Sequence, residues 1–300
     1  MESEQEIADK VREILKRLGG KECRFDESIS IFAERLKLLS DSGRYGGLRK
    51  RIFAANDWNG FRSYAFEVGF AYDFESNGRE MAYEVRALSE GRSSVDFRYQ
   101  SDKKTVHFEL RLIAQKKEIS DSIRSQLDAT GSYAILRNGE GEKGEVVRIQ
   151  NLALSKCMDE DGQPIKFPPP KIGEYNVIVC NVSETLLGCI DTQDCLLAMY
   201  GDPAVPRECE RGVFGLCQEL PDSAPGQIRE YYDKFKHFRE TIHGLLFVRK
   251  PRQFIEPLLE WESEYNFVPN CTLMRENEIA DIDRDLGSFL KPWRDPNGET

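Results

Sequence analysis

The sequence predicts an α/β fold in which a mixed β-sheet is flanked by helices. Apolar residues recur at helical spacing over residues 61–72, and the Ser-Asn-Gly turn that begins at Ser76 ends this helix. Strand-like runs follow at 81–88, 94–99 and 105–114, with short polar turns between them. This order predicts a helix followed by an antiparallel meander.

The later half of the chain alternates between apolar strands and helices. Residues 175–182 and 242–248 are near-continuous apolar runs, as expected for strands buried on both faces. Helical stretches at 192–200 and 227–238 lie between them. We therefore expect a strand–crossover–strand arrangement beside the meander.

Amphipathic patterns at the amino-terminal end predict a pair of helices. Apolar residues recur at helical spacing from Ile7 to Leu18, a glycine pair follows, and a second such stretch covers 27–39. The tail after about Glu278 is charged, and we expect it to be loosely attached. The predicted organisation is an N-terminal helical segment at 1–45, a central domain at 46–275 and a charged C-terminal tail at 276–300.

Composition limits the classes of protein that need to be considered. With 40% hydrophobic and 31% charged residues the chain is too apolar to be disordered. A formal net charge of -10 argues against a protein that coats nucleic acid, although it allows a local basic cleft. The first residues lack the basic and then apolar pattern of a secretory signal, and no apolar run is long enough to cross a bilayer. We therefore expect a cytoplasmic protein without a membrane partner.

The eight cysteines do not form a recognisable metal motif. None are spaced as CxxC, and several lie in apolar runs, which predicts buried free thiols. A zinc site built from Cys189, Cys195, Cys209 and Cys217 remains the alternative.

Two acidic residues stand on neighbouring predicted strands. Asp96 lies in the second strand of the meander and Glu109 in the third, joined by a tight turn. Strand geometry allows the two carboxylates to lie across from each other, near enough to bind one Mg²⁺ or Mn²⁺ ion. Such a metal polarises a phosphoryl oxygen and generates hydroxide at neutral pH. A solvent-facing row of acids with cross-strand ion pairs produces the same pattern, so both interpretations stay open.

The order of these residues resembles the PD-(D/E)xK nuclease superfamily, which has a restriction-endonuclease-like fold. In that pattern a helix carries Glu, a strand follows, the second strand carries Asp and the third carries ExK. The matching positions here are Glu67, Asp96, Glu109 and Arg111, within a resemblance that spans about 48–251. It implies a mixed core sheet flanked by helices, with Asp96 and Glu109 holding the metal and Glu67 and Arg111 taking part in catalysis.

Two positions depart from the superfamily pattern. Val95 stands where the motif has proline, and Arg111 stands where it has lysine. A guanidinium is permanently charged and cannot relay a proton. Lys116 or Lys117, at the end of the same strand, is therefore a candidate replacement. Gln115 shares a strand face with Arg111 and is a candidate to orient a water molecule.

Basic residues are densest in the segment RYGGLRKR. Its cations are Arg44, Arg49, Lys50 and Arg51. Together with the two lysines at the end of the third strand, they are the candidate contacts to a nucleic-acid backbone. A solvated helix start is the simpler explanation of the same cluster.

Two functions fit these patterns. The first is a metal-dependent endonuclease that hydrolyses phosphodiester bonds of DNA. The second is a catalytically inactive protein of the same fold that binds nucleic acid or a protein partner. The Asp96 and Glu109 pair favours the first, and Arg111 favours the second.

Overall fold

The computed structural model describes residues 2–18, 26–87, 93–113, 125–126, 129–131, 141–157, 166–183, 190–201, 212–214, 226–249 and 264–293. The helices are α1 (Glu4–Arg17), α2 (Asp26–Asp41), α3 (Gly46–Ala54), α4 (Trp58–Glu75), α6 (Gly141–Leu154), α7 (Thr192–Tyr200), α8 (Gly226–Thr241) and α9 (Glu276–Gly287). The strands are β1 (Met81–Val85), β2 (Val95–Gln100), β3 (Thr105–Leu112), β4 (Glu174–Asn181), β5 (Gly244–Arg249), β6 (Glu264–Pro269) and β7 (Lys291–Pro292).

All of these strands join one mixed sheet in chain order, from β1 at one edge to β7 at the other. β1, β2 and β3 form the predicted antiparallel meander. β3, β4 and β5 are parallel neighbours, and α6, α7 and α8 lie in the connections between them. β6 is antiparallel to β5, and β7 is parallel to β6. The predicted α/β class is therefore confirmed.

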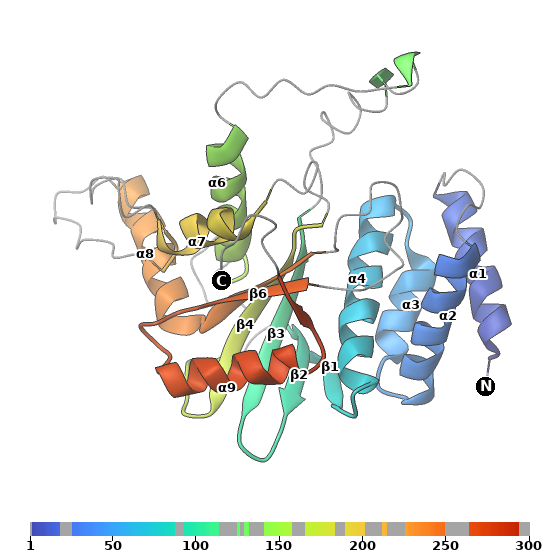
Figure 1. Cartoon of the computed structure of the whole chain (residues 1–300), viewed down its shortest axis with the longest axis horizontal. Helices are drawn as coiled ribbons and strands as arrows, with labels where there is room; N and C mark the ends of the chain where they lie inside the picture. The colour runs from blue at the N-terminus through green and yellow to red at the C-terminus, as the bar shows by residue number, and fades with distance from the viewer. Residues whose placement is uncertain are drawn as a thin grey trace.

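Helices cover both faces of the sheet, which explains the continuous apolar strands (Figure 1). In β4, Val177 and Val179 pack into a core shared with α4 and α9. The alternate residues Ile178 and Cys180 pack into a second core shared with α6 and α7. Because successive side chains of a strand point to opposite faces, a strand covered on both sides needs apolar residues at every position.

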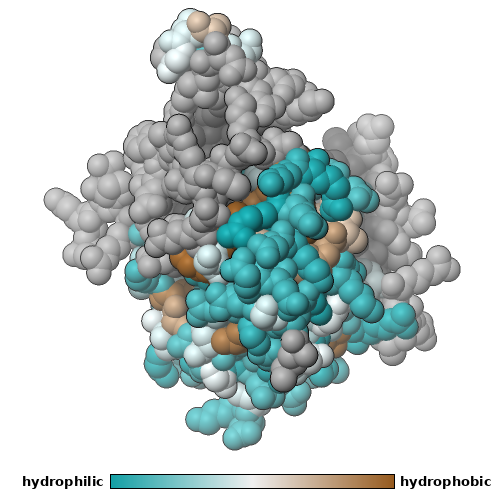
Figure 2. Space-filling view, turned by 90° about the vertical axis from the view of Figure 1, so that its right-hand side faces the viewer, coloured by the Kyte–Doolittle hydropathy of each residue, from teal (hydrophilic) through white to brown (hydrophobic). Residues whose placement is uncertain are grey.

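The amino-terminal helices extend the first of these cores. Ser3 and Glu6 form a capping box that starts α1, and the helix buries Ile7, Val11 and Ile14. These side chains belong to the same apolar cluster as α4 and the sheet. The described part of the predicted 1–45 segment is thus mostly helical, and it shares its core with the central part of the chain. The outward face of these helices is mostly hydrophilic (Figure 2).

The expectation of a loosely attached tail after about Glu278 is wrong for the described residues, which extend to Trp293. Residues Glu276–Gly287 form helix α9, which packs against the sheet through the buried side chains of Ile282 and Leu286. Leu290 continues this apolar face into the same core. Among the acidic residues of this segment, apolar residues recur every four positions, and this spacing places them on one face of the helix.

Two further sequence predictions concern membranes and cysteines. No helix in the described part of the chain is long and apolar enough to span a membrane. Cys157, Cys180 and Cys195 are buried free thiols, whereas Cys271 is exposed. Of the four cysteines considered as a zinc site only Cys195 lies within the described residues, and it is enclosed in the second core.

Candidate functional site

The predicted acidic residues lie where β2 and β3 separate, a place we call the fork. Pairing between the two strands ends at Phe97 and Phe108, so Asp96 and Glu109 are the first residues beyond the paired region. Oδ2 of Asp96 accepts a hydrogen bond from the backbone N–H of Leu110 at 2.7 Å. A carboxylate thus takes the place of the next backbone hydrogen bond between the strands. The structure therefore brings the two predicted metal ligands to neighbouring positions.

A local change in the backbone accompanies the fork. Glu84 in β1 has φ of 51°, in the left-handed region that side chains other than glycine rarely adopt. Before it, Tyr83 packs against the core shared with α4, and after it Val85 packs against the opposite core. Residues two apart in a regular strand share one face, so the strand is shifted by one residue at Glu84. Val95 and Phe97, on either side of Asp96 in β2, likewise pack against opposite cores. Strained backbone of this kind persists only where the surroundings determine it, and such positions cluster at functional sites.

Helix α4 contributes a buried carboxyl group, that of Glu67, to the fork. Asp57 caps this helix by accepting a hydrogen bond from Gly60 at 2.8 Å. Glu67, which the helical pattern placed at the edge of the apolar face, is only 6% exposed. Its Oε2 accepts a hydrogen bond from the Tyr83 hydroxyl at 2.9 Å. Burial and then the charge of Asp96 raise the pKa of Glu67 to about 8.

Glu109 is completely buried and is held by two cations. The ammonium group of Lys166 donates to Oε1 at 2.6 Å, and the guanidinium of Arg111 donates to the same oxygen. Oε2 is buried and has no hydrogen-bond partner among the described residues. Burial, followed by the charge of Asp96, raises the pKa of Glu109, whereas the two cations oppose this shift.

Two lysines at the fork were not found from the sequence. Lys166 lies 57 residues from its partner Glu109 and immediately before a buried phenylalanine and a run of prolines. The Asn176 side chain donates to the carbonyl of Pro168 at 2.8 Å, which fixes this segment against β4. Lys156 follows α6, and burial and then the charge of Arg111 lower its pKa to about 8. No local pattern marks either lysine, because their position depends on how the crossover packs on the sheet.

Other predicted residues lie apart from the fork or outside the described part of the chain. Gln115, Lys116 and Lys117 lie outside the described residues. The basic segment comprises the start of α3 and the residues just before it. Its arginines form ion pairs: Arg44 with Glu75 and Glu80, Arg49 with Glu2, and Arg51 with Glu84. Lys50 is exposed and forms no ion pair with a described residue. Arg51 also donates to the Tyr83 hydroxyl at 3.3 Å, which connects this segment to Glu67.

The fork can be compared with the requirements of a hard divalent cation. Within the described ranges, no three or more His, Cys, Asp and Glu side chains are arranged to hold a metal. Mg²⁺ commonly needs only one or two protein carboxylates, with water and substrate phosphate completing its coordination. The carboxylate of Asp96 and the unpartnered Oε2 of Glu109 fit this smaller requirement. Oε1 of Glu109 is already occupied by Lys166 and Arg111.

No protein-family model, no curated protein and no solved structure matches this chain. The chemistry of the fork is therefore inferred from its own residues.

Proposed function

We propose that this chain is a metal-dependent nuclease with a restriction-endonuclease-like core, which hydrolyses phosphodiester bonds of DNA. One observation carries the proposal: acidic side chains from α4, β2 and β3 converge at the fork, where burial and then the charge of Asp96 raise the pKa of both Glu67 and Glu109. The order of α4, the meander, α6 and a β4 strand parallel to β3 supports the same fold assignment.

Asp96 and Glu109 would hold one Mg²⁺ or Mn²⁺ ion, with water and a substrate phosphate as its other ligands. The bound ion would polarise a phosphoryl oxygen and supply hydroxide near neutral pH. Glu67 has its pKa raised to about 8, so it holds a proton at neutral pH and can exchange it. A group that titrates close to the working pH is suited to general acid–base catalysis.

Lys166 supplies the kind of cation that Arg111 cannot replace. Both bind the same oxygen of Glu109, but only an ammonium group can exchange a proton. Burial and then the charge of Arg111 lower the pKa of Lys156, so this lysine also lies near the fork. The fork thus contains several basic groups that can offset the charge of a phosphodiester in its transition state. We therefore assign to Lys166 the part that the superfamily motif gives to its lysine.

A second candidate function is supported by the ion pairs of Glu109. Because Lys166 and Arg111 offset the charge of this carboxylate, Glu109 does not need a metal for charge balance. A protein of this fold that has lost catalysis and binds nucleic acid or a protein partner would show the same arrangement. Metal binding separates the two functions.

The test uses isosteric variants at the fork and a matched control. Mg²⁺ and Mn²⁺ are titrated calorimetrically into the wild type, Asp96→Asn, Glu109→Gln and the control Asp102→Asn, with and without duplex DNA. Asp102 is an exposed acid in the turn that joins β2 to β3. We expect the two fork variants to lose metal binding and cleavage of plasmid and single-stranded DNA, and the control to keep both. Absence of metal binding in the wild type, even with DNA, would support the inactive alternative.

A further inference from the structure

The outer edge of β6 is only partly covered. β6 pairs with β5 along its whole length, from Glu264 to Pro269. On its other side β7 pairs only with Glu264 and Tyr265. Within the described residues the remainder of β6 is therefore an open edge of the sheet, and open edges can pair with another extended chain.

Alternation of the backbone groups shows which of them face this edge. Asn270 donates to the carbonyl of His243, so even-numbered residues of β6 direct their backbone groups toward β5 and odd-numbered ones direct theirs outward. The carbonyl of Tyr265 accepts from Trp293 at 2.7 Å, and that of Pro269 accepts from the Tyr200 hydroxyl. Between these two covered positions lie the outward N–H and C=O of Phe267, for which no partner is found among the described residues. They form a short pairing site of one residue on the edge.

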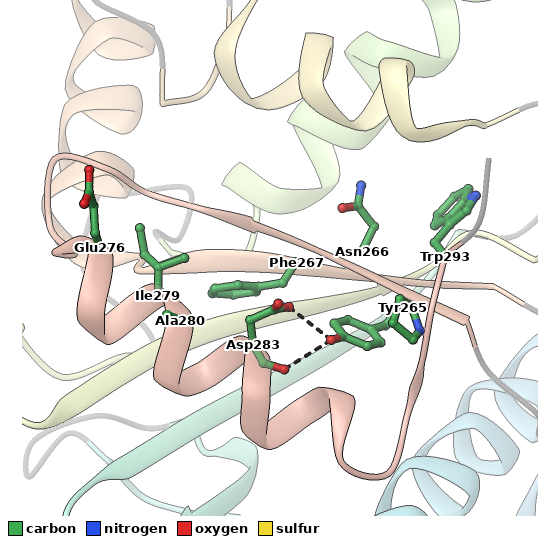
Figure 3. A pocket seen from close by; sticks show the side chains of 9 residues that line it. Tyr265, Asn266, Phe267, Glu276, Ile279, Ala280, Asp283 and Trp293 are labelled. Carbon is green, nitrogen blue, oxygen red and sulfur yellow. Dashed lines mark hydrogen bonds between the residues drawn. The ribbon is translucent and has the colours of Figure 1, made fainter. Parts of the chain in front are cut away.

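A pocket of about 470 Å³ lies beside this site, between β6, α9 and β7 (Figure 3). The ring of Phe267 and the side chain of Ile279 line its apolar part, and Trp293 lies at its β7 end. Glu276 and Asp283 place two carboxylates on its α9 wall. Asp283 accepts a hydrogen bond from the Tyr265 hydroxyl at 3.1 Å.

The charge of the pocket is not compensated within the described part of the chain. The other acids of α9 have partners on the sheet side: Lys104 pairs with Asp281 at 2.7 Å and with Asp285 at 2.6 Å, and Tyr175 donates to Glu278. No ion pair joins Glu276 or Asp283 to a described residue. A ligand that enters this pocket therefore meets an apolar floor and two carboxylates.

The features of the edge and of the pocket select one kind of occupant. A nucleic acid is repelled by the carboxylates, and a second copy of this chain would bring its own net charge of -10. An extended peptide can exchange hydrogen bonds with the N–H and C=O of Phe267, and a strand sends alternate side chains to the same face. A lysine or arginine on that face would reach the two acids, with its stem packed on the apolar floor.

We propose that the β6 edge and the adjacent α9 pocket form a docking site for an extended basic peptide segment of a partner protein, which pairs with Phe267 and places a cationic side chain between Glu276 and Asp283. This site shares no residue with the fork and does not depend on the proposed nuclease function.

The probe is a fluorescein-labelled pentapeptide of alternating valine and lysine with blocked termini, compared with the peptide that carries glutamate in place of lysine. Binding to the full chain is measured by fluorescence polarisation at low and moderate salt. The pocket variant is the double substitution Glu276→Gln and Asp283→Asn. Its control, Glu4→Gln with Glu13→Gln, removes the same charge from the exposed side of α1.

We expect the lysine peptide to bind and the glutamate peptide not to bind. The pocket variant should weaken binding about tenfold, as two exposed charge pairs allow, whereas the control should leave it unchanged. Bound peptide should also slow hydrogen exchange at the Phe267 N–H. Equal binding of both peptides, equal effects of the two double variants, or protection of Phe267 by self-association in sedimentation experiments would each overturn the proposal.

Discussion

The ion pair between Lys166 and Glu109 has the most predictable energetic consequence of any interaction at the fork. Glu109 is completely buried and the Lys166 side chain is 13% exposed, so water screens neither charge well. Lys166→Met keeps the apolar stem of the side chain and removes its charge. Loss of one partner of a buried ion pair costs about 3–5 kcal/mol, because the other charge stays buried. Arg111 still contacts the carboxylate, so we expect Lys166→Met to lower the free energy of unfolding by about 3 kcal/mol.

A double-mutant cycle separates the pair from its surroundings. Glu109→Gln alone leaves Lys166 and Arg111 without their shared negative charge, whereas the double variant removes both charges of the pair. We expect the double variant to be more stable than the sum of the single effects predicts, with a coupling of about 2 kcal/mol. Urea unfolding at pH 7 measures all four proteins. Lys171→Met is the control, since its ion pair with Glu174 spans 3.8 Å and its side chain is 66% exposed.

Additive effects, or a cost for Lys166→Met no larger than that of the control, would refute this account of the fork. The same variant also bears on metal binding. If Mn²⁺ binds at Glu109, removal of a competing ammonium group from Oε1 should tighten binding even though the protein is less stable. Weaker Mn²⁺ binding would mean that Lys166 positions Glu109 for the ion and does not compete with it.

Other positions yield further predictions. Nδ1 of His243 accepts a hydrogen bond from the backbone N–H of Asn176 at 3.0 Å, and burial lowers the pKa of His243 to about 4. The neutral imidazole therefore stabilises the fold fully above its ordinary pKa of 6.5, and this stabilisation is lost as the pH falls toward 4. At most about 3 kcal/mol is lost in that window, and His243→Gln should flatten the dependence of urea midpoints on pH. Gly244→Ala should destabilise by about 1–3 kcal/mol in the same assay, because its Cβ would lie 2.6 Å from the Phe267 ring. Glu84→Gly should have a higher thermal midpoint than Glu84→Ala, since both variants remove the ion pair with Arg51 and only glycine relieves the φ of 51°, a difference of about 1 kcal/mol; a lower midpoint for the glycine variant would show that the conformation is not strained.

The fold was predictable from sequence where local patterns carried the signal. β4 and β5 are covered by helices on both faces, so their apolar runs are continuous and short. β6 was missed because it lies near the edge of the sheet and mixes polar with apolar residues. Helix α9 was mistaken for a tail because its acids outnumber the two buried positions that hold it to the sheet. The charge of a segment says little about its attachment when a few apolar residues share one helix face.

Some residues of the candidate site could likewise be predicted from local sequence patterns, and others could not. Asp96 and Glu109 belong to adjacent strands joined by a short turn, so their proximity followed from sequence spacing. Arg111 was expected on the same strand face as Glu109, and the two side chains do form an ion pair. Lys166 could not be found, because it reaches Glu109 only after the crossover through α6 has folded. Contacts made across a crossover depend on tertiary packing, which leaves no local periodicity to read.

Stability alone does not account for the acids at the fork. Burial disfavours the charged forms of Glu67 and Glu109 and so raises the pKa of both. The Tyr83 hydroxyl compensates in part at Glu67, and two cations do so at Glu109. Apolar residues of similar volume are often as stable as a buried ion pair or more so, and Asp96 sits in a strand whose neighbours Val95 and Phe97 are apolar. Perturbed titratable groups that share one partner are typical of functional sites. The unpartnered Oε2 of Glu109 gives this inference a specific location, because a buried acceptor without a donor is destabilising until a cation or a donor binds it.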